Sequence, residues 1–356
     1  MADVARIESY VGGRPRPVIS TSMRRKSPNP LFLGVDIGGT KVAVGLVDSR
    51  GTILARSRSP MAANRQSQDG LQSVTDAIDT LLRDRRAKAA QAIGISIPGW
   101  VDASHKILLG ATNIPCWHNF PLAREVTKRY GMPARIENDA NAAALAEAVW
   151  GAGASYRNVF YVTLGTGVGT GFVVSGKIYS GATGAGGEGG HVTIDFRGPL
   201  CGCGKRGCIE AYASGTAIAR RARELLSERA ANGSRTLALA HGKVEDVTSE
   251  IVSAAAAEGD QFAIDVLNEA AGRLGIWLGT IIDLLEPEVI VLGGGVGHVM
   301  ASRIEQIRQS LETWAISPRW RDIPIVEARY GSESAIVGAA ALCLSKRQRQ
   351  SAALRK

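Results

Sequence analysis

Short runs of β-branched and aromatic residues, separated by glycine turns, occur in two similar segments of the chain. LFLGVDIGGTKVAVGLVDSRGTILARS predicts strands over 31–37, 41–48 and 52–57. NVFYVTLGTGVGTGFVVSGKIYSG predicts strands over 158–164, 171–174 and 177–179. Both segments read strand, glycine turn, strand, tight turn, strand. This shared layout indicates two related halves, each beginning with the same antiparallel unit.

Apolar residues at helical spacing lie between and after these units. They predict helices over 68–88, from Asn138–Asp139 to Gly151, over 259–285 with a break near Gly275 or Gly279, and over 332–348. Further strands are expected at 92–99 and 286–295. Because helices alternate with strands in both halves, the chain belongs to the α/β class.

The net charge of +9 is confined to the two ends of the chain. Residues 1–30 carry six basic and two acidic residues, and residues 344–356 carry five basic residues and no acid, so the body between them is formally neutral. Basic tails of this kind are usually solvated, and we expect 1–30 to be a disordered tail outside the fold. A weak polyanion-binding role of the tails stays open.

Composition excludes several classes of protein. The 356 residues suggest two domains, at about 100–200 residues each. No uncharged apolar run reaches the roughly 18 residues of a membrane span, and no signal-peptide core is present, so we expect a cytoplasmic protein with no membrane partner. Thiols stay reduced there. The crowding of three of the five cysteines into CGCGKRGC, at 201–208, therefore favours metal or redox chemistry over disulfides.

The two glycine turns are candidates for binding phosphate, because a turn without side chains exposes consecutive backbone N–H groups. In DIGGTK, Thr40 and Lys41 add a hydroxyl and a charge, and Asp36 could hold a magnesium-bound water. Structural hairpins are the alternative. The expected phosphate- or ATP-binding residues are Asp36, Gly38, Gly39, Thr40, Lys41, Thr166, Gly167 and, in the glycines that end the strand at 286–295, Gly293 and Gly294.

Two motif matches are set aside. Residues 171–178 approach the P-loop pattern, but Ile178 stands where Ser or Thr must bind magnesium. Residues 184–189, GAGGEG, match the dinucleotide fingerprint by letters only, because no strand and helix frame them.

Asp139 lies at the first turn of the predicted helix in RIENDANAAA. One interpretation is helix capping, which Asn and Asp do routinely. The other is a catalytic base, because phosphoryl transfer to an alcohol needs a carboxylate that accepts the hydroxyl proton. Two phosphate-binding turns together with this carboxylate favour the second interpretation.

The motifs DIGGTK, ENDANAAALAE, LGTGVGTG, GGEGGH, CGCGKRGCIE and VLGGG occur in the order seen in the ROK family of bacterial sugar kinases and sugar-responsive repressors. The resemblance covers residues 31 to about 343 and is strongest to the family's glucokinases. It implies an actin-like ATPase (ribonuclease H-like) fold, with two lobes around a cleft. The N-terminal lobe would comprise 31–141, joined by the closing helix 332–348, and the C-terminal lobe 142–331, with a zinc loop at 191–208.

The resemblance also implies an activity and a set of residues. The activity is ATP-dependent phosphorylation of a hexose, glucose to glucose 6-phosphate, with ATP and Mg²⁺, and with Asp139 taking the proton from the 6-hydroxyl. The sugar contacts implied are the backbone near Gly99 and the side chains of Asn138, Asp139, Glu188, His191 and Glu210.

One imidazole and three thiols near these glutamates form a typical closed tetrahedral zinc set, provided by His191, Cys201, Cys203 and Cys208. No position is left for an activated water, so the Zn²⁺ would be structural. It would tie together both sides of a sugar-reading loop, because Glu188 precedes and Glu210 follows the cysteines. Fortuitous adjacency of the cysteines or a redox loop is the alternative.

Three other functions remain open from the sequence. A kinase for fructose, mannose or an N-acetylhexosamine would need the same residue types. A repressor of the same family would carry a DNA-binding module before the first strand, and only about thirty residues precede Leu31, so no specific nucleic-acid partner is expected. A filament-forming actin-like protein would not need the ENDA motif beside Glu188 and His191. The expected partners are hexose, ATP and further copies of the chain in a homo-oligomer.

Overall fold

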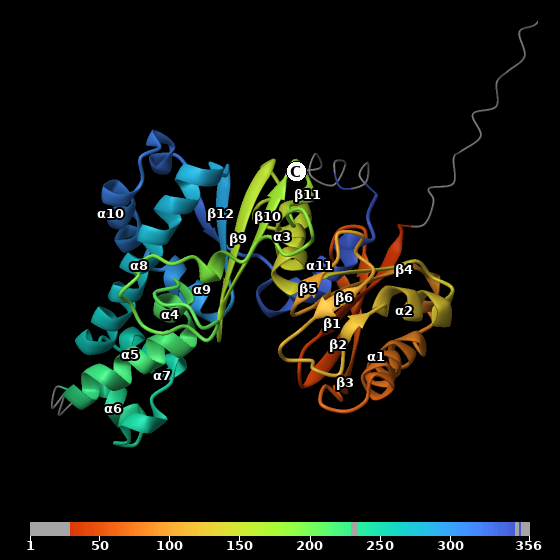
Figure 1. Ribbon diagram of the computed structural model, residues 1–356, viewed down its shortest axis with the longest axis horizontal. Coiled ribbons are helices and arrows are strands. Elements are labelled where there is room, and N and C mark those ends of the chain that lie inside the picture. Colours follow the sequence, from red (N-terminus) through yellow and green to blue (C-terminus); the bar gives the residue numbers. More distant parts are fainter. Residues whose placement is uncertain (1–28, 229–233, 346–348, 350–356) are drawn as a thin grey trace, which may run out of the picture.

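The computed structural model describes residues 29–228, 234–345 and Arg349. The tail predicted at 1–30 therefore lies, apart from its last two residues, outside the described residues, as does the C-terminal part of the helix predicted at 332–348. Within the described residues the chain forms two five-stranded sheets and one small three-stranded sheet. Figure 1 shows the two large sheets in separate halves, each with its own helices.

The first large sheet has the strand order β3-β2-β1-β4-β8. Its strands are β1 (Leu31–Ile37), β2 (Lys41–Asp48), β3 (Ile53–Pro60), β4 (Ala90–Ile97) and β8 (Ala134–Asn138). The second has the order β11-β10-β9-β12-β13. Its strands are β9 (Asn158–Leu164), β10 (Val168–Val174), β11 (Lys177–Ile178), β12 (Val289–Gly293) and β13 (Ile325–Glu327).

The two sheets repeat one pairing scheme. β1 pairs antiparallel with β2 and parallel with β4, and β9 pairs antiparallel with β10 and parallel with β12. The outer strands β8 and β13 continue the parallel side. The duplicated unit predicted from the two glycine-turn segments is thus confirmed, and so is the α/β class.

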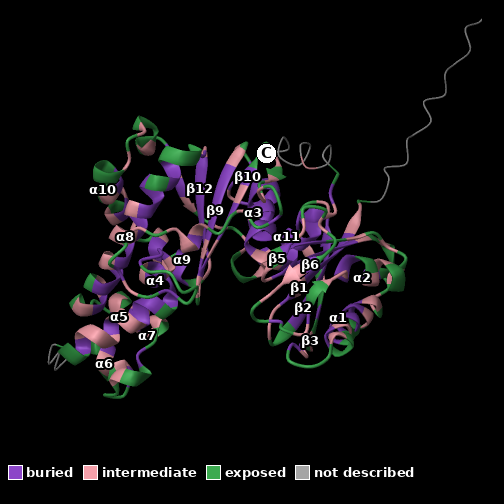
Figure 2. Ribbon diagram, in the orientation of Figure 1, coloured by how far each residue is buried: buried purple, intermediate pink, exposed green. Residues whose placement is uncertain are grey.

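Helices α3 (Asp139–Trp150) and α11 (Ser334–Leu342) lie between the two sheets. Both helices are buried on almost every side, as their purple ribbons show in Figure 2. They cross closely, because a Cβ on Gly338 of α11 would meet the carbonyl oxygen of Ala142 in α3 at 2.1 Å. Alanine-rich sequences suit such positions, since small side chains let the backbones approach.

The remaining helices cover the outer faces of the two sheets. The first half has α1 (Ser67–Leu82) and α2 (Leu122–Tyr130), which close an apolar core with β1, β2, β4 and β8. The second half has a separate, larger core. Its helices are α4 (Glu210–Ala213), α5 (Gly215–Glu228), α6 (Arg235–Leu239), α7 (Ser249–Ala257), α8 (Gln261–Leu285), α9 (Gly295–Ala301) and α10 (Ile304–Trp314).

The break predicted in the long helix near Gly275 or Gly279 is wrong, because α8 is continuous from Gln261 to Leu285. The two glycines serve packing instead. A Cβ on Gly275 would lie 2.5 Å from the carbonyl oxygen of Ile307, and one on Gly279 would lie 2.7 Å from that of Trp314. Both carbonyls belong to α10, which therefore lies directly against α8 at these positions.

The second glycine turn is shorter than its sequence suggests. Only Gly165, Thr166 and Gly167 form the turn, and β10 already begins at Val168 instead of the predicted 171. Gly169 and Gly171 lie within β10, where Cβ atoms would meet the Cβ atoms of Ala140 and Ala144 in α3 at 3.1 and 2.6 Å. These glycines let α3 pack onto the sheet.

The expected lobe boundary between residues 141 and 142 falls inside α3. This helix continues directly from β8 of the first sheet and packs on β9 and β10 of the second. α11 packs on β1 and β4, so the C-terminal part of the chain returns to the first half. The small sheet β5 (Trp100–Val101), β6 (Leu108–Gly110) and β7 (His118–Phe120) also belongs to the first half.

Candidate functional site

A cavity of about 450 Å³ lies where the two halves meet. Its walls come from six segments: the loop after β4, residues 110–113 at the end of β6, the start of α3, the turn 165–167 with its flanking strand ends, the glycine-rich loop that leads to His191, and the start of α4. All the side chains and backbone positions expected to bind a sugar line it, namely Gly99, Asn138, Asp139, Glu188, His191 and Glu210. The fold therefore brings together residues separated by more than 100 positions in the chain.

Asn138 and Asp139 stand at the junction of β8 and α3. The Asn138 side chain caps the helix, because its Oδ1 accepts hydrogen bonds from the backbone N–H groups of Ala140 and Asn141 at 3.0 and 3.2 Å. Its Nδ2 donates to the carbonyl oxygen of Gly99 at 3.2 Å. Capping is thus done mainly by Asn138, which leaves the carboxylate of its neighbour available for chemistry.

The Asp139 carboxylate has one oxygen held and one without a partner among the described residues. Oδ1 accepts a hydrogen bond from the backbone N–H of Ala140 at 2.8 Å. Burial raises the pKa of Asp139 above its ordinary value, hydrogen bonds from the backbone N–H groups of Ala140 and of Asp139 itself oppose the shift, and the negative charge of Glu188 adds to it. A carboxylate with a raised pKa is a better proton acceptor, as a general base requires.

Glu210 connects the glycine turn 165–167 with the cysteine loop. Its Oε2 accepts a hydrogen bond from the backbone N–H of Val168 at 2.9 Å, and its Oε1 lies 3.5 Å from the sulfur of Cys201. A Cβ on Gly167 would come within 2.6 Å of Oε2. Glycine at position 167 therefore lets the glutamate carboxylate keep its hydrogen bond to Val168.

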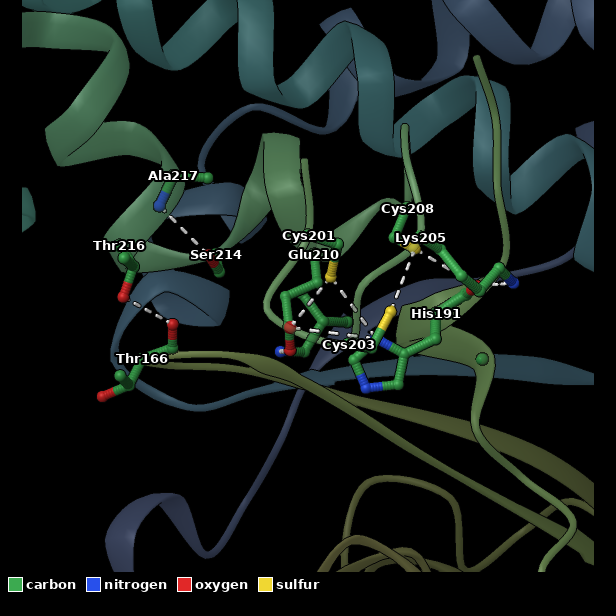
Figure 3. A network of polar contacts seen from close by, with 12 residues as sticks. Thr166, His191, Cys201, Cys203, Lys205, Cys208, Glu210, Ser214, Thr216 and Ala217 are labelled. Atoms are coloured by element: carbon green, nitrogen blue, oxygen red, sulfur yellow. Dashed lines mark hydrogen bonds and ion pairs between the residues drawn. The ribbon is translucent and has the colours of Figure 1, made fainter. Parts of the chain in front are cut away.

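His191 and the three clustered cysteines place their ligand atoms within 4.8 Å of one another. The sulfur of Cys201 lies 3.6 Å from Nδ1 of His191, and the sulfurs of Cys203 and Cys208 lie 3.7 Å apart. Figure 3 shows the four side chains converging beside Glu210. A tetrahedral Zn²⁺ with bonds of about 2.3 Å to sulfur and about 2.05 Å to nitrogen requires ligand separations of roughly 3.6–3.8 Å. The residues present fit zinc.

The cysteine loop is also fixed by its own backbone. Cys201 donates its N–H to the carbonyl of Lys205 at 2.8 Å, and Gly204 donates back to Cys201 at 3.0 Å. The Lys205 ammonium donates to the carbonyl of His191 at 2.7 Å. Because Nδ1 of His191 faces Cys201 while the residue also lines the first cavity, a bound metal would restrain the imidazole next to that cavity.

A second cavity, of about 690 Å³, shares Gly165 and Thr166 with the first. It is lined by the first residues of three helices, Gly215 of α5, Ser249 of α7 and Gly295 of α9. The Thr216 hydroxyl donates to the carbonyl of Thr166 at 2.9 Å (Figure 3). Helix N-termini present unpaired N–H groups and attract phosphate.

The residues expected to bind ATP are placed unequally around this second cavity. Thr166 lines both cavities, and Gly167 lines the first. Gly293 and Gly294 line neither. Gly293 packs against Tyr161, Gly294 against the carbonyl of Leu164, and the next residue, Gly295, forms the wall instead.

The DIGGTK turn borders the first cavity without lining it. Gly38 donates its N–H to the carbonyl of Lys41 at 2.9 Å, and Thr40 and Lys41 are exposed. Gly39 lies against the backbone of Asn113, which lines the cavity. Burial and the neighbouring charge of Asp139 raise the pKa of Asp36 to about 6, with Lys41 opposing the shift. The two carboxylates are thus close enough to repel each other.

Several residues of the two cavities were not anticipated from the sequence. Trp100 and Asn113 line the first cavity, as do Gly184, Gly186 and Gly187 of the run that was set aside as a false dinucleotide motif. Gly215, Thr216 and Ser249 line the second. The dipeptide Gly215–Thr216 after a serine was the one available signal, since it marks a helix start.

The repeated five-stranded sheets around a paired α3 and α11, with the cavity between the halves, define an actin-like ATPase fold. None of the helices in the described part of the chain has the length and apolarity needed to span a bilayer. Residues 32–346 match the ROK family, and the chain belongs to this family.

Two glucokinases and one regulator illustrate the similarity. A glucokinase of Streptomyces coelicolor is 35% identical over 314 residues, which are 88% of this chain and 97% of that protein. The crystal structure of a ROK family glucokinase from Streptomyces griseus, in complex with glucose and AMPPNP, has a TM-score of 0.74 and 35% identity, over 88% of this chain and 98% of that one. A ROK family transcriptional regulator homologous to the E. coli MLC protein has a TM-score of 0.79 and 28% identity, over 92% of this chain and 80% of that one.

Proposed function

We propose that this protein is an ATP-dependent hexose kinase that converts glucose to glucose 6-phosphate. The observation that carries the proposal is the junction of the two cavities at Gly165 and Thr166. One cavity holds carboxylates and amides suited to sugar hydroxyls, and the other is lined by helix N-termini suited to phosphate. A phosphoryl group transferred between the two ligands would pass at this junction. The ROK glucokinases that resemble this chain support glucose as the acceptor.

Different residues would accept the proton, bind the sugar hydroxyls and hold the magnesium ion. Asp139 accepts the proton of the attacking hydroxyl through its unpartnered oxygen, Oδ2, while Asn138, Glu188, His191 and Glu210 bind the other hydroxyls. Asn138 is already oriented by its bonds to α3 and Gly99, so little freedom is lost when sugar binds. Magnesium would neutralise charge on the transferred phosphoryl group, and Asp36, whose carboxylate lies near that of Asp139, would hold one of its waters.

The zinc site would stabilise the sugar-binding loop without taking part in the reaction. Four protein ligands fill a tetrahedral shell, which leaves no place for a reacting water. His191 is itself one of the four ligands, and Glu210 follows the ligand Cys208 by two residues. Two of the proposed sugar contacts are therefore restrained by one metal.

The proposed function is tested with purified protein, ATP, Mg²⁺ and a panel of hexoses that includes glucose, fructose, mannose, N-acetylglucosamine and N-acetylmannosamine. Glucose is expected to give the highest kcat/KM, measured by coupled ADP release. A higher kcat/KM with another sugar would identify that sugar as the preferred substrate. Sugar binding without turnover of any sugar would overturn the kinase assignment and favour a sugar-responsive regulator.

The kinase activity should fall when the pH drops below the pKa of Asp139 and recover when the pH is raised above that pKa. Because burial raises the pKa of Asp139, its carboxylate becomes protonated at a higher pH than that of an ordinary aspartate, which has a pKa of 3.8. A protonated carboxyl group cannot accept the hydroxyl proton. We expect kcat/KM for sugar to fall about tenfold per pH unit below this pKa. A profile with its acid limb at or below 3.8, in protein still folded by circular dichroism, would contradict the assignment.

Gly167→Ala should weaken sugar binding through Glu210. The added methyl group would meet Oε2 of Glu210, so the carboxylate must leave its hydrogen bond to Val168. We expect KM for sugar to rise by roughly tenfold to a hundredfold, the usual worth of hydrogen bonds to a charged group.

Gly272→Ala is the matched control for this variant. Gly272 lies in α8 and lines neither cavity, a Cβ there would meet only the Ser310 hydroxyl at 3.6 Å, and its KM should equal that of the parent protein. An unchanged KM in Gly167→Ala would show that Glu210 does not bind the sugar.

A further inference from the structure

Trp100 is a large aromatic side chain exposed at the wall of the first cavity. It is 49% exposed, and among the exposed large apolar side chains of the described residues it alone lines this cavity. A half-exposed indole leaves apolar surface in water that a ligand could cover, and exposed apolar surface of this kind often marks a binding site.

The backbone of Trp100 is held rigidly relative to the proposed base. Trp100 pairs with Gly110 in the small sheet, and the preceding carbonyl, that of Gly99, accepts the amide of Asn138. Gly99 has φ +123°, a value that side-chain-bearing residues rarely adopt, so this conformation is set by the sequence at that position. The backbone of Trp100 is therefore held beside Asn138, the neighbour of Asp139.

The indole also reaches across the cavity to the second half of the chain. Its Nε1–H donates a hydrogen bond to Oε1 of Glu188 at 2.9 Å, between residues 88 positions apart. The glycine-rich loop before Glu188 lies directly against the same strand, because a Cβ on Gly184 would meet the carbonyl of Val101 at 1.9 Å. The other carboxylate oxygen, Oε2 of Glu188, has no partner in the described part of the chain.

We propose that Trp100 is a sugar-binding residue that determines affinity for a pyranose: its ring covers an apolar C–H face of the sugar, and its N–H holds Glu188 so that Oε2 accepts a sugar hydroxyl. A pyranose offers both features, an apolar face and equatorial hydroxyls at its edge. An aromatic ring with a polar N–H matches this combination. The inference rests on the proposed function for the identity of the site as a sugar site.

Trp100→Phe and Trp100→Ala separate the two roles. Phenylalanine keeps a ring and removes the N–H, so KM for sugar should rise roughly tenfold, the effect of one hydrogen bond to a charged acceptor. Alanine removes both, and KM should rise about fifty-fold. KM for ATP should stay within about twofold and kcat within about threefold, because neither variant touches the second cavity or Asp139.

Direct binding gives a readout that does not need turnover. Glucose added without ATP should change the tryptophan emission of the parent protein, and the change should be lost in Trp100→Phe. Trp314→Phe is the matched control, because Trp314 is similarly exposed, at 56%, and lies at the end of α10 away from the cavity. That variant should keep both the emission change and the parent KM.

The outcomes distinguish this inference from the proposed function. Parent-like sugar KM and emission change in both Trp100 variants would overturn the role of Trp100 and leave the kinase assignment standing. Equal losses for sugar and ATP would also overturn it, because a general disturbance of the fold would then explain them. Glucose binding that depends on Trp100, in a protein that phosphorylates no sugar, would support the inference and reject the kinase.

Discussion

Asp139→Asn is expected to lower kcat by about two to four orders of magnitude, the usual contribution of a general base. Asparagine has the same shape, and its Oδ1 can still accept the N–H of Ala140, so α3 should begin as before. Its amide cannot take the hydroxyl proton. KM for sugar should therefore stay within about threefold, and the loss should appear in kcat alone.

The measurement combines steady-state kinetics with sugar binding in the absence of ATP. Asp76→Asn is the matched control, since Asp76 is exposed on α1 and contacts only the side chain of Gln72 among the described residues. It should keep parent kinetics. A well-folded Asp139→Asn protein with near-parent turnover would mean that another group accepts the proton.

Cys201→Ser is expected to remove both the metal and most of the sugar affinity. The parent protein should contain close to one zinc per chain without added metal. Structural zinc binds with on the order of 10 kcal/mol in small domains, so losing one of four ligands should disorder the loop. Because His191 is itself a ligand and Glu210 follows the ligand Cys208 by two residues, KM for sugar should rise by about tenfold or more.

Global unfolding is not expected in this variant, because the core of the second half is built mainly from β9, β12, α5, α7, α8 and α10, and residues 191–208 add only the partly buried Val192 and Ile194 at its edge. Zinc content is measured by elemental analysis, and the fold by circular dichroism. Cys116→Ser is the control, since Cys116 lies in the first half of the chain, and it should retain zinc and activity. An active parent preparation without zinc would contradict the metal assignment. Unchanged sugar affinity in Cys201→Ser would contradict the link between the loop and the sugar.

Strands and turns were the most predictable part of the fold. β1, β2 and β9 begin and end at the residues expected, because alternation of small turn residues and β-branched residues is a local property. Glycines inside elements were not predictable in the same way. Gly275 predicted a helix break, and it proved to be a contact point for α10, which is thirty residues further along the chain.

The residues of the candidate site also fall into a predictable group and an unpredictable one. Asn138, Asp139, Glu188, His191 and Glu210 could be selected from their motifs, and the structure gathers all five around one cavity. Trp100 could not be selected from the sequence, because a tryptophan after Pro-Gly is compatible with an ordinary surface turn as well as with a binding site. Its importance arises from Glu188, which approaches it from the other half of the chain.

By itself, the sequence determined the chemistry of the protein: which residues can accept a proton, which four can bind zinc, and where the backbone turns, because these depend on side-chain type and on neighbours a few residues away. Only the tertiary structure decided which of them meet. The pairing of α3 with α11, the hydrogen bond from Val168 to Glu210 and the hydrogen bond from Trp100 to Glu188 join segments 42 to nearly 200 residues apart. Such contacts depend on the packing of whole elements, and no local pattern specifies them.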